Sequence, residues 1–149
     1  MKFVIQCTTQ ASVIIDQKLY SEIGKGFLVL IGICDEDTKE TADKMVRKLI
    51  GMRIFSDENG KTNLALKDVD GQLLLVSQFT LYADCKKGNR PSFVKAGSPQ
   101  HANELYEYII DACKKEVPVV KTGVFGAEME VALINDGPFT IILDSKDLA

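Results

Sequence analysis

The sequence predicts an α+β fold in which a mainly antiparallel sheet curls toward a barrel and two helices pack against it. Three observations lead to this prediction. Strand-like apolar segments follow one another through short turns, only two segments have the periodicity of a helix, and few helices connect successive strands. With 149 residues, of which 46% are hydrophobic and 26% charged, the chain has the size and composition of one soluble domain, residues 1–149.

The first quarter of the chain is expected to form four strands. Residues 2–7 have the pattern of a strand, and residues 11–16 and 18–23 have that of a hairpin rich in β-branched side chains. Residues 27–34 are almost all apolar, which predicts a central buried strand.

A helix is expected after this strand. Asp37 or Thr38 can cap its first turn, and Glu40 stands at the capping-box distance from Asp37. Its apolar positions recur every three or four residues, so one face is predicted to pack on a sheet, namely Ala42, Met45, Val46 and Leu49. Residues 56–60 are typical of a turn, and residues 73–76 predict another buried strand.

The second half of the chain adds a polar loop, a second helix and two closing strands. The loop covers residues 83–97, and Ser98-Pro99 is typical of a helix start because proline suits the first helical position. The helix is expected to end near Lys114 and to bury Ala102, Leu105, Tyr106, Ile109, Ile110 and Cys113. Residues 129–134 and 139–143 predict the last two strands.

Composition argues against several classes of function. The net charge is −3, which disfavours a generally basic nucleic-acid coat but allows a local basic patch. No apolar run is long enough for a membrane span and no signal peptide is evident, so we expect a cytoplasmic protein. The four cysteines form no C-x-x-C pair and His101 is the only histidine, so neither a zinc site, nor a redox pair, nor a multi-histidine metal site is expected.

The segment from Asn135 to Thr140 stands between the last two apolar runs and reads Asn-Asp-Gly-Pro-Phe-Thr. Its spacing favours a hairpin turn, because Asn-Asp-Gly between strand-like runs is a strong turn signal. Gly137 and Pro138 carry no acid, base or nucleophile, so any functional role must come from carbonyl oxygens and backbone shape.

A second polar segment, residues 77–81 (Ser-Gln-Phe-Thr-Leu), marks the end of a buried strand. Such residues can merely satisfy neighbouring backbone groups, or they can face a cleft. In the functional interpretation, Ser77, Gln78 and Thr80 surround a reacting carbonyl group, and the backbone N–H groups of Phe79 and Thr80 stabilise the developing oxyanion.

A side-chain nucleophile has weak support. The Thr80 hydroxyl needs a base within hydrogen-bond reach, and His101 is expected to be a solvated residue in the first turn of a helix. Cys85 with His101 is the other conceivable dyad, although nothing in the spacing requires the two to meet. A hydrolase that uses Thr80 or Cys85 stays an alternative.

The loop at residues 85–95 contains four cations and no acid. It follows directly on the polar strand end, so Lys86, Lys87 and Arg90 could form a cationic rim beside a cleft and hold a phosphate-bearing substrate. A run of this kind can also be no more than a solvated face.

Four separated segments together carry a resemblance. They are residues 77–81, Gly88 to Phe93 (Gly-Asn-Arg-Pro-Ser-Phe), Thr122-Gly123 with Phe125-Gly126-Ala127, and Asn135 to Thr140. In this order they are similar to the D-aminoacyl-tRNA deacylase family over nearly the whole chain. The resemblance implies a homodimeric α+β enzyme that hydrolyses the ester between a D-amino acid, or glycine, and the 3′ end of tRNA.

The resemblance also implies roles for individual residues. The Gly137-Pro138 peptide bond is cis, enters the partner's active site and excludes amino acids with an L-side chain. It cannot exclude glycine, because glycine has no side chain. Ser77, Gln78, Phe79 and Thr80 form the catalytic segment, in which backbone N–H groups hold the carbonyl and the ribose 2′-hydroxyl helps to activate water. Phe125, Met129 and Asn135 contact the substrate, and Lys86, Lys87 and Arg90 hold tRNA phosphates, with no metal or cofactor.

Two positions depart from the family pattern. Cys7 stands where typical members have an arginine that is thought to brace the Gly-Pro element, and Val124 replaces another common arginine. A thiol cannot supply the directed donors of a guanidinium group. A catalytically degenerate tRNA-binding member of the family therefore stays an alternative to the enzyme.

Overall fold

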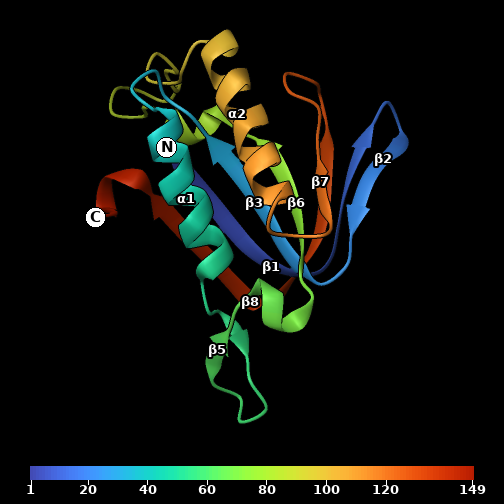
Figure 1. Cartoon of the computed structure of the whole chain (residues 1–149). Coiled ribbons are helices and arrows are strands. Elements are labelled where there is room, and N and C mark those ends of the chain that lie inside the picture. The colour runs from blue at the N-terminus through green and yellow to red at the C-terminus, as the bar shows by residue number, and fades with distance from the viewer.

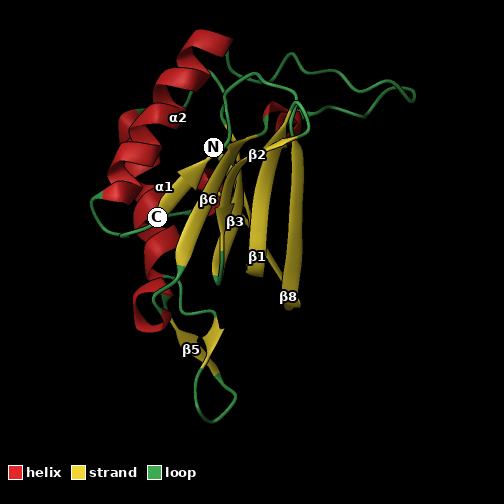
Figure 2. Cartoon of the chain, turned by 90° about the vertical axis from the view of Figure 1, so that its right-hand side faces the viewer, coloured by secondary structure: helices red, strands yellow, loops and turns green.

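The computed structural model describes all 149 residues and has an α+β fold in which two helices cover one face of a curled sheet (Figures 1 and 2). The helices are α1 (Lys39–Gly51) and α2 (Pro99–Lys114). The strand order is β2-β1-β3-β6-β7, and β8 pairs with the other edge of β1. These strands are β1 (Lys2–Ile15), β2 (Lys18–Ile23), β3 (Gly26–Gly32), β6 (Gln72–Ser77), β7 (Val120–Thr122) and β8 (Glu130–Asp144).

The sheet is mixed and nearly closes into a barrel. β1 runs antiparallel to β2, β3 and β8, whereas β3–β6 and β6–β7 are parallel pairs. The parallel pairs arise because α1 and α2 each lie on a crossover between two strands of the sheet, as parallel neighbours require. The Ser21 hydroxyl donates to the Thr122 carbonyl at 2.7 Å and thereby links the outer strands β2 and β7.

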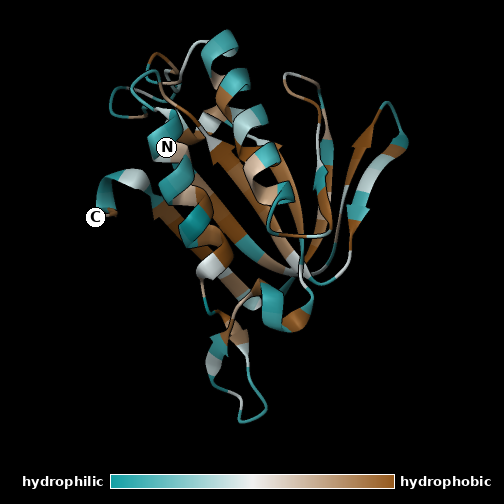
Figure 3. Ribbon diagram, in the orientation of Figure 1, coloured by the Kyte–Doolittle hydropathy of each residue, from teal (hydrophilic) through white to brown (hydrophobic).

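Alternate residues of the central strands supply two separate apolar clusters. Phe27, Val29 and Ile31 of β3 face the helices and belong to the larger cluster, whereas Leu28 faces the smaller cluster inside the curl of the sheet. This is why β3 is apolar throughout and β6 is apolar between its polar end residues Gln72 and Ser77, as the hydropathy colouring shows (Figure 3).

Both predicted helix faces are confirmed, since the four predicted residues of α1 and the six of α2 are all buried. The predicted cap of α1 is only partly right. Thr38 caps the helix and exchanges hydrogen bonds with Thr41, so Glu40 has no part in the capping box. Asp37 is buried instead, where it accepts hydrogen bonds from the amine of Met1 at 2.7 Å and from the backbone of Cys34 at 2.8 Å.

Two strand predictions need correction. Residues 2–7 and 11–16 do not form separate strands, because β1 continues from Lys2 to Ile15 and bends at irregular pairings around Thr8. The predicted hairpin turn at Gly137-Pro138 is also wrong. Both flanking segments belong to β8, which pairs with β1 on each side of the Gly-Pro pair. A continuous partner strand, which periodicity cannot reveal, holds both segments in one line.

The remaining elements are short. β4 (Phe55–Ser56) and β5 (Thr62–Leu64) form a small hairpin that projects from the body of the molecule (Figure 1). The 3₁₀ helices are η1 (Leu66–Val69), η2 (Phe79–Tyr82) and η3 (Ser145–Asp147). None of the helices combines the length and the apolar character that a membrane-spanning helix requires.

Candidate active site

A cavity of about 560 Å³ opens where β3 and β6 end and α2 begins. Its wall contains five of the sequence-predicted site residues, namely Ser77, Gln78, Phe79, Phe125 and Met129. The rest of the wall is mainly apolar and includes Ile31, Phe93, Gly97 and Ala102. An apolar hollow with a few polar groups at one edge is typical of a small-molecule site.

Two unpaired backbone donors lie in the segment that forms the polar edge of this cavity, and of their two residues only Phe79 lines the wall. The chain turns from β6 into η2 at Gln78, so the N–H groups of Phe79 and Thr80 come too early in the turn to reach a carbonyl within η2. Neither group donates to any other backbone or side-chain acceptor of the chain. They are therefore free to donate to a bound oxygen atom.

The Thr80 hydroxyl is held within its own segment. It accepts a hydrogen bond from the side-chain amide of Gln78, and Thr80 itself is exposed and does not line the cavity. Ser77 is half-buried in the wall. The four predicted catalytic residues are thus adjacent, but they approach the cavity chiefly through Ser77, Gln78 and Phe79.

His101 is not placed as a base for either nucleophile considered from the sequence. His101 lies in the first turn of α2 as predicted, but its ring is only partly exposed and its Nε2 lies 3.0 Å from the Asp37 carbonyl oxygen. Cys85 is exposed and makes no side-chain hydrogen bond. The ring ties the start of α2 to the turn before α1 and forms no dyad with Thr80 or Cys85.

The opposite wall is fixed by packing between α2 and the segment before β8. The Phe125 ring packs against Tyr106 with 6.1 Å between ring centroids, and the buried Tyr106 hydroxyl donates to the Leu75 carbonyl at 2.7 Å. Burial raises the pKa of this hydroxyl, so it stays a neutral donor. Met129 packs on Gly123, where a Cβ atom would lie only 2.6 Å from the Met129 sulfur.

An aromatic pair stands at the rim of the cavity. The rings of Phe79 and Phe93 meet edge to face with centroids 5.1 Å apart, although the side chains are 55% and 37% exposed. Phe93 belongs to the long loop between η2 and α2 that extends from the body of the molecule (Figure 2). Phe93 was predicted only as part of a segment that carries the resemblance. Its position as an aromatic residue within a basic loop is the signal that could have identified it.

The same loop carries the predicted cationic rim. Lys86, Lys87 and Arg90 are exposed and make no ion pair. Lys95 differs from them, because it lies 3.0 Å from Asp84. The backbone hydrogen bond from Lys86, followed by the contact with Lys95, lowers the pKa of Asp84, so this carboxylate stays charged. Three of the four cationic side chains in the loop therefore have no carboxylate partner.

The Gly-Pro segment lies away from this cavity. Gly137 and Pro138 are exposed, do not line the cavity of their own chain, and are joined by a cis peptide bond. Thr140 pairs with Gln6, and Asn135 pairs with Thr8. Residues 136–139 therefore leave the ladder opposite the single residue 7, and we call this segment the β8 excursion.

Asn135 closes the base of the β8 excursion rather than lining the cavity. Its Oδ1 accepts from the Phe139 N–H at 3.0 Å, and its Nδ2 donates to the Thr140 hydroxyl at 3.0 Å. Cys7 lies buried beneath the excursion, and burial, followed by the nearby charge of Asp136, raises the pKa of its thiol to about 11. The thiol is neutral at neutral pH.

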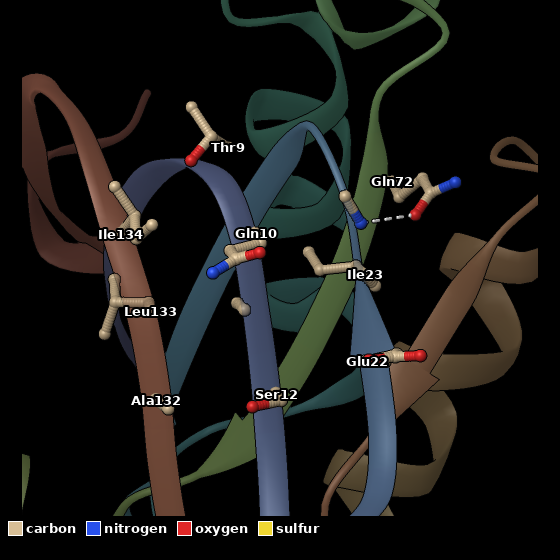
Figure 4. Close-up of a pocket in the computed structure, with 11 residues that line it drawn as sticks. Thr9, Gln10, Ser12, Glu22, Ile23, Gln72, Ala132, Leu133 and Ile134 are labelled. Atoms are coloured by element: carbon tan, nitrogen blue, oxygen red, sulfur yellow. Dashed lines mark hydrogen bonds between the residues drawn. The ribbon is translucent and has the colours of Figure 1, made fainter.

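A second cavity, also about 560 Å³, lies at the bend of β1 (Figure 4). Gln10, Ile23 and Ile134 line it, and the Gln72 side chain closes one side by accepting from the Gly24 N–H at 2.8 Å. It contains none of the predicted site residues. In neither cavity, nor elsewhere in the chain, do three or more His, Cys, Asp or Glu side chains gather as metal ligands would.

The sequence of the chain matches a known protein family. Residues 4–144 match the model of a family described as D-Tyr-tRNA(Tyr) deacylase. The chain is 51% identical over 146 residues to a D-aminoacyl-tRNA deacylase of Clostridium novyi (strain NT) and 50% identical to one of Clostridium acetobutylicum, with 98% of each chain covered.

Solved structures agree with the fold. The structure titled c-Myc DNA Unwinding Element Binding Protein superposes with a TM-score of 0.91 at 41% identity and covers 97% of this chain and 98% of its own. A probable eukaryotic D-amino acid tRNA deacylase superposes with a TM-score of 0.83 at 17% identity, over 95% of this chain and 97% of its own, which is a likeness of fold alone.

Proposed function

Since the chain belongs to the D-Tyr-tRNA(Tyr) deacylase family, we propose that it hydrolyses the ester bond between a D-amino acid and the 3′ end of tRNA. Water adds to the ester carbonyl carbon, the bond from that carbon to the ribose oxygen breaks, and the products are the free D-amino acid and tRNA with a free hydroxyl group. Glycyl-tRNA is a substrate by the same route, because the selection acts against side chains of L configuration.

The observation that carries this proposal is the pair of unpaired N–H groups of Phe79 and Thr80, in the turn that begins at the cavity wall with Phe79. As water adds to the carbonyl carbon, negative charge develops on the carbonyl oxygen, and fixed donors aimed at that oxygen lower the barrier. Removal of one such donor in other enzymes costs roughly 10²–10³ in kcat. Because these donors belong to the backbone, substitution of side chains leaves them in place.

No side chain is required as the nucleophile. The Thr80 hydroxyl is bound to Gln78, and the His101 ring is bound to the Asp37 carbonyl. An aminoacyl ester is already an activated substrate, so positioning a water molecule beside a stabilised carbonyl suffices. We assign the proton transfer from that water to the 2′-hydroxyl of the substrate's terminal ribose, which lies next to the reacting ester.

The rim of the cavity suits the acceptor end of tRNA. The three free cations of the loop, Lys86, Lys87 and Arg90, hold backbone phosphates. The exposed rings of Phe79 and Phe93 offer an apolar surface for unpaired bases, which stack on aromatic side chains in single-stranded RNA recognition. Phosphates and bases together position the ester over the N–H pair.

Stereochemical selection requires a second copy of the chain in this proposal. The β8 excursion is exposed and stands outside its own cavity, so it can exclude a substrate only from the cavity of a partner. Ile134 and Ile142 of β8 are 52% and 73% exposed, so an apolar face on the same strand is available to a partner. Backbone carbonyl groups of the excursion then occupy the space that an L-side chain needs and leave room for hydrogen or a D-side chain.

Matched substrates test the proposal. We expect hydrolysis of D-aminoacyl-tRNA and glycyl-tRNA, and little hydrolysis of the L-aminoacyl-tRNA with the same side chain, when loss of the ester is followed at equal enzyme concentration. If neither stereoisomer is hydrolysed while tRNA still binds, the chain is a catalytically degenerate binding member of the family. Equal hydrolysis of both would contradict the selection mechanism alone.

A further inference from the structure

We infer that Asn135, through Thr140 and Gln6, is the positioning device that fixes the β8 excursion and with it the stereoselectivity of the site. The inference rests on the proposed function, since the excursion matters only if it selects substrates. It assigns the support of the excursion to three side chains, since Cys7, the residue opposite the excursion, is a free cysteine.

The excursion has little support from the sheet itself. Residues 136–139 lie opposite residue 7 alone, and regular pairing with β1 resumes only at Thr140 on one side and Asn135 on the other. The β1 strand is irregular at the same place, where Thr9 stands at the bend and Ile134 lies on the adjacent β8 strand (Figure 4). The backbone ladder therefore leaves the conformation of these four residues to side-chain contacts.

Asn135 supplies those contacts from one end of the excursion to the other. Its Oδ1 accepts from the N–H of Phe139, four residues later, and its Nδ2 donates to the hydroxyl of Thr140. A single planar amide thus joins the residue that enters the excursion to the two residues that leave it. Both bonds are 3.0 Å long, within the normal range for protein hydrogen bonds.

Gln6 connects this closure to the sheet. Its Nε2 donates to the Thr140 hydroxyl at 3.3 Å, so the oxygen of Thr140 accepts from side chains of both strands. Phe139 is half-buried and packs against the larger apolar cluster, which anchors the far end of the excursion. The closure is therefore attached to β1 and to the core, and not only to itself.

No ion pair supports the excursion. The two ion pairs of the chain involve Met1 with Asp37 and Lys95 with Asp84, and neither reaches the excursion. Together with the packing of Phe139, the two hydrogen bonds of the Asn135 amide therefore hold the ends of the segment that contains Gly137 and Pro138.

Three variants and a control test the inference. Asn135→Ala removes both hydrogen bonds, and Thr140→Val removes the hydroxyl oxygen at nearly constant volume. Asn135→Asp keeps the closure, because a carboxylate accepts from the Phe139 N–H and the Thr140 hydroxyl can turn to donate. Asn59→Ala is the matched control, since this exposed asparagine uses only its backbone N–H in the turn after β4.

The readout is the ratio of kcat/KM for L- and D-aminoacyl-tRNA. With two hydrogen bonds lost, we expect Asn135→Ala to raise this ratio about tenfold, Thr140→Val to raise it less, and Asn135→Asp and Asn59→Ala to leave it near the wild-type value. Hydrogen exchange of the Phe139 amide gives a reading independent of activity, because it should accelerate in Asn135→Ala and not in Asn135→Asp.

An unchanged ratio in both Asn135→Ala and Thr140→Val would overturn the inference while leaving the deacylase function intact. An Asn135→Asp variant as unselective as Asn135→Ala would also overturn it. If Asn135→Ala fails to fold, Thr140→Val alone decides. A wild-type chain that hydrolyses no aminoacyl-tRNA would instead overturn the proposed function, so the two failures are distinguishable.

Discussion

Substitution of Gly137 by alanine is the most direct perturbation of the β8 excursion. Gly137 has a φ of +131°, and an added Cβ atom would lie 3.0 Å from the backbone nitrogen and 3.2 Å from the Cβ of Phe139. Holding a residue other than glycine in such a backbone region costs about 1–3 kcal/mol. Phe139 is anchored in the core, so we expect the excursion, and not the core, to move.

The same free energy sets the expected loss of selection. If the position of the excursion determines discrimination, about 1–3 kcal/mol corresponds to a rise of roughly 5- to 150-fold in the ratio of L- to D-aminoacyl-tRNA hydrolysis. Hydrolysis of the D-substrate should change little, because the N–H groups of Phe79 and Thr80 are untouched. The assay follows ester loss from both stereoisomers under single-turnover conditions.

A matched variant separates selection from stability. Gly60 also has a positive φ, of +76°, but lies exposed in the turn between β4 and β5 with no atom within 4 Å of an added Cβ. Gly60→Ala and Gly137→Ala should both lower the melting temperature, by about 2–4 °C for each kcal/mol in a chain of this size. If only the melting temperature changes in Gly137→Ala and the L to D ratio does not, the excursion plays no part in selection.

Three further predictions concern the site and its surroundings. Thr80→Ala should retain hydrolysis within about tenfold of wild type in single-turnover assays, because the proposed donors are backbone groups; a loss beyond about 10³ would indicate a nucleophilic hydroxyl. The double variant Lys86→Glu, Lys87→Glu should raise KM for aminoacyl-tRNA and lower the salt slope of binding by about 2, whereas Lys61→Glu in the distant β4–β5 turn should not; an unchanged slope would remove these lysines from the tRNA interface. The folded-state pKa of Cys7 is about 11 and exceeds its reference value of 9.0, because burial favours the protonated thiol. The stability that the protonated Cys7 thiol contributes is therefore complete below pH 9.0 and is lost as the pH rises toward 11. Urea unfolding should therefore show a smaller loss of stability across this pH range for Cys7→Ala than for wild type, and equal losses would contradict the assignment.

Most elements of the fold could be predicted because their signals are local. The periodicity of α1 and α2 identified every buried residue of their predicted faces, since a helix that packs on a sheet must repeat its apolar positions every three to four residues. The continuous apolar run of β3 predicted a strand buried at the centre, and it packs between the two clusters. The length of β1 and β8 could not be predicted, because a strand that bends at irregular pairings looks like two strands.

The candidate site divides in the same way. Residues 77–80 and Phe125 could be found from composition and resemblance, because they are local motifs at strand ends. Phe93 and Ala102 joined the cavity only through tertiary packing, since one comes from a polar loop and the other from the buried face of α2. The hydrogen bonds of Asn135 to Phe139 and Thr140 also depend on the tertiary course of β8, and its contact with the substrate stays a prediction.

Local patterns were enough to locate the apolar segments, the two helices and the short motifs that could carry chemistry, because each of these depends on residues close together in the chain. Tertiary contacts were needed to show that the Gly-Pro pair interrupts one long strand and does not turn between two, and that this pair lies away from the cavity of the same chain. The physical reason is that β8 takes its course from pairing with β1, more than a hundred residues away, and no local pattern records that partner.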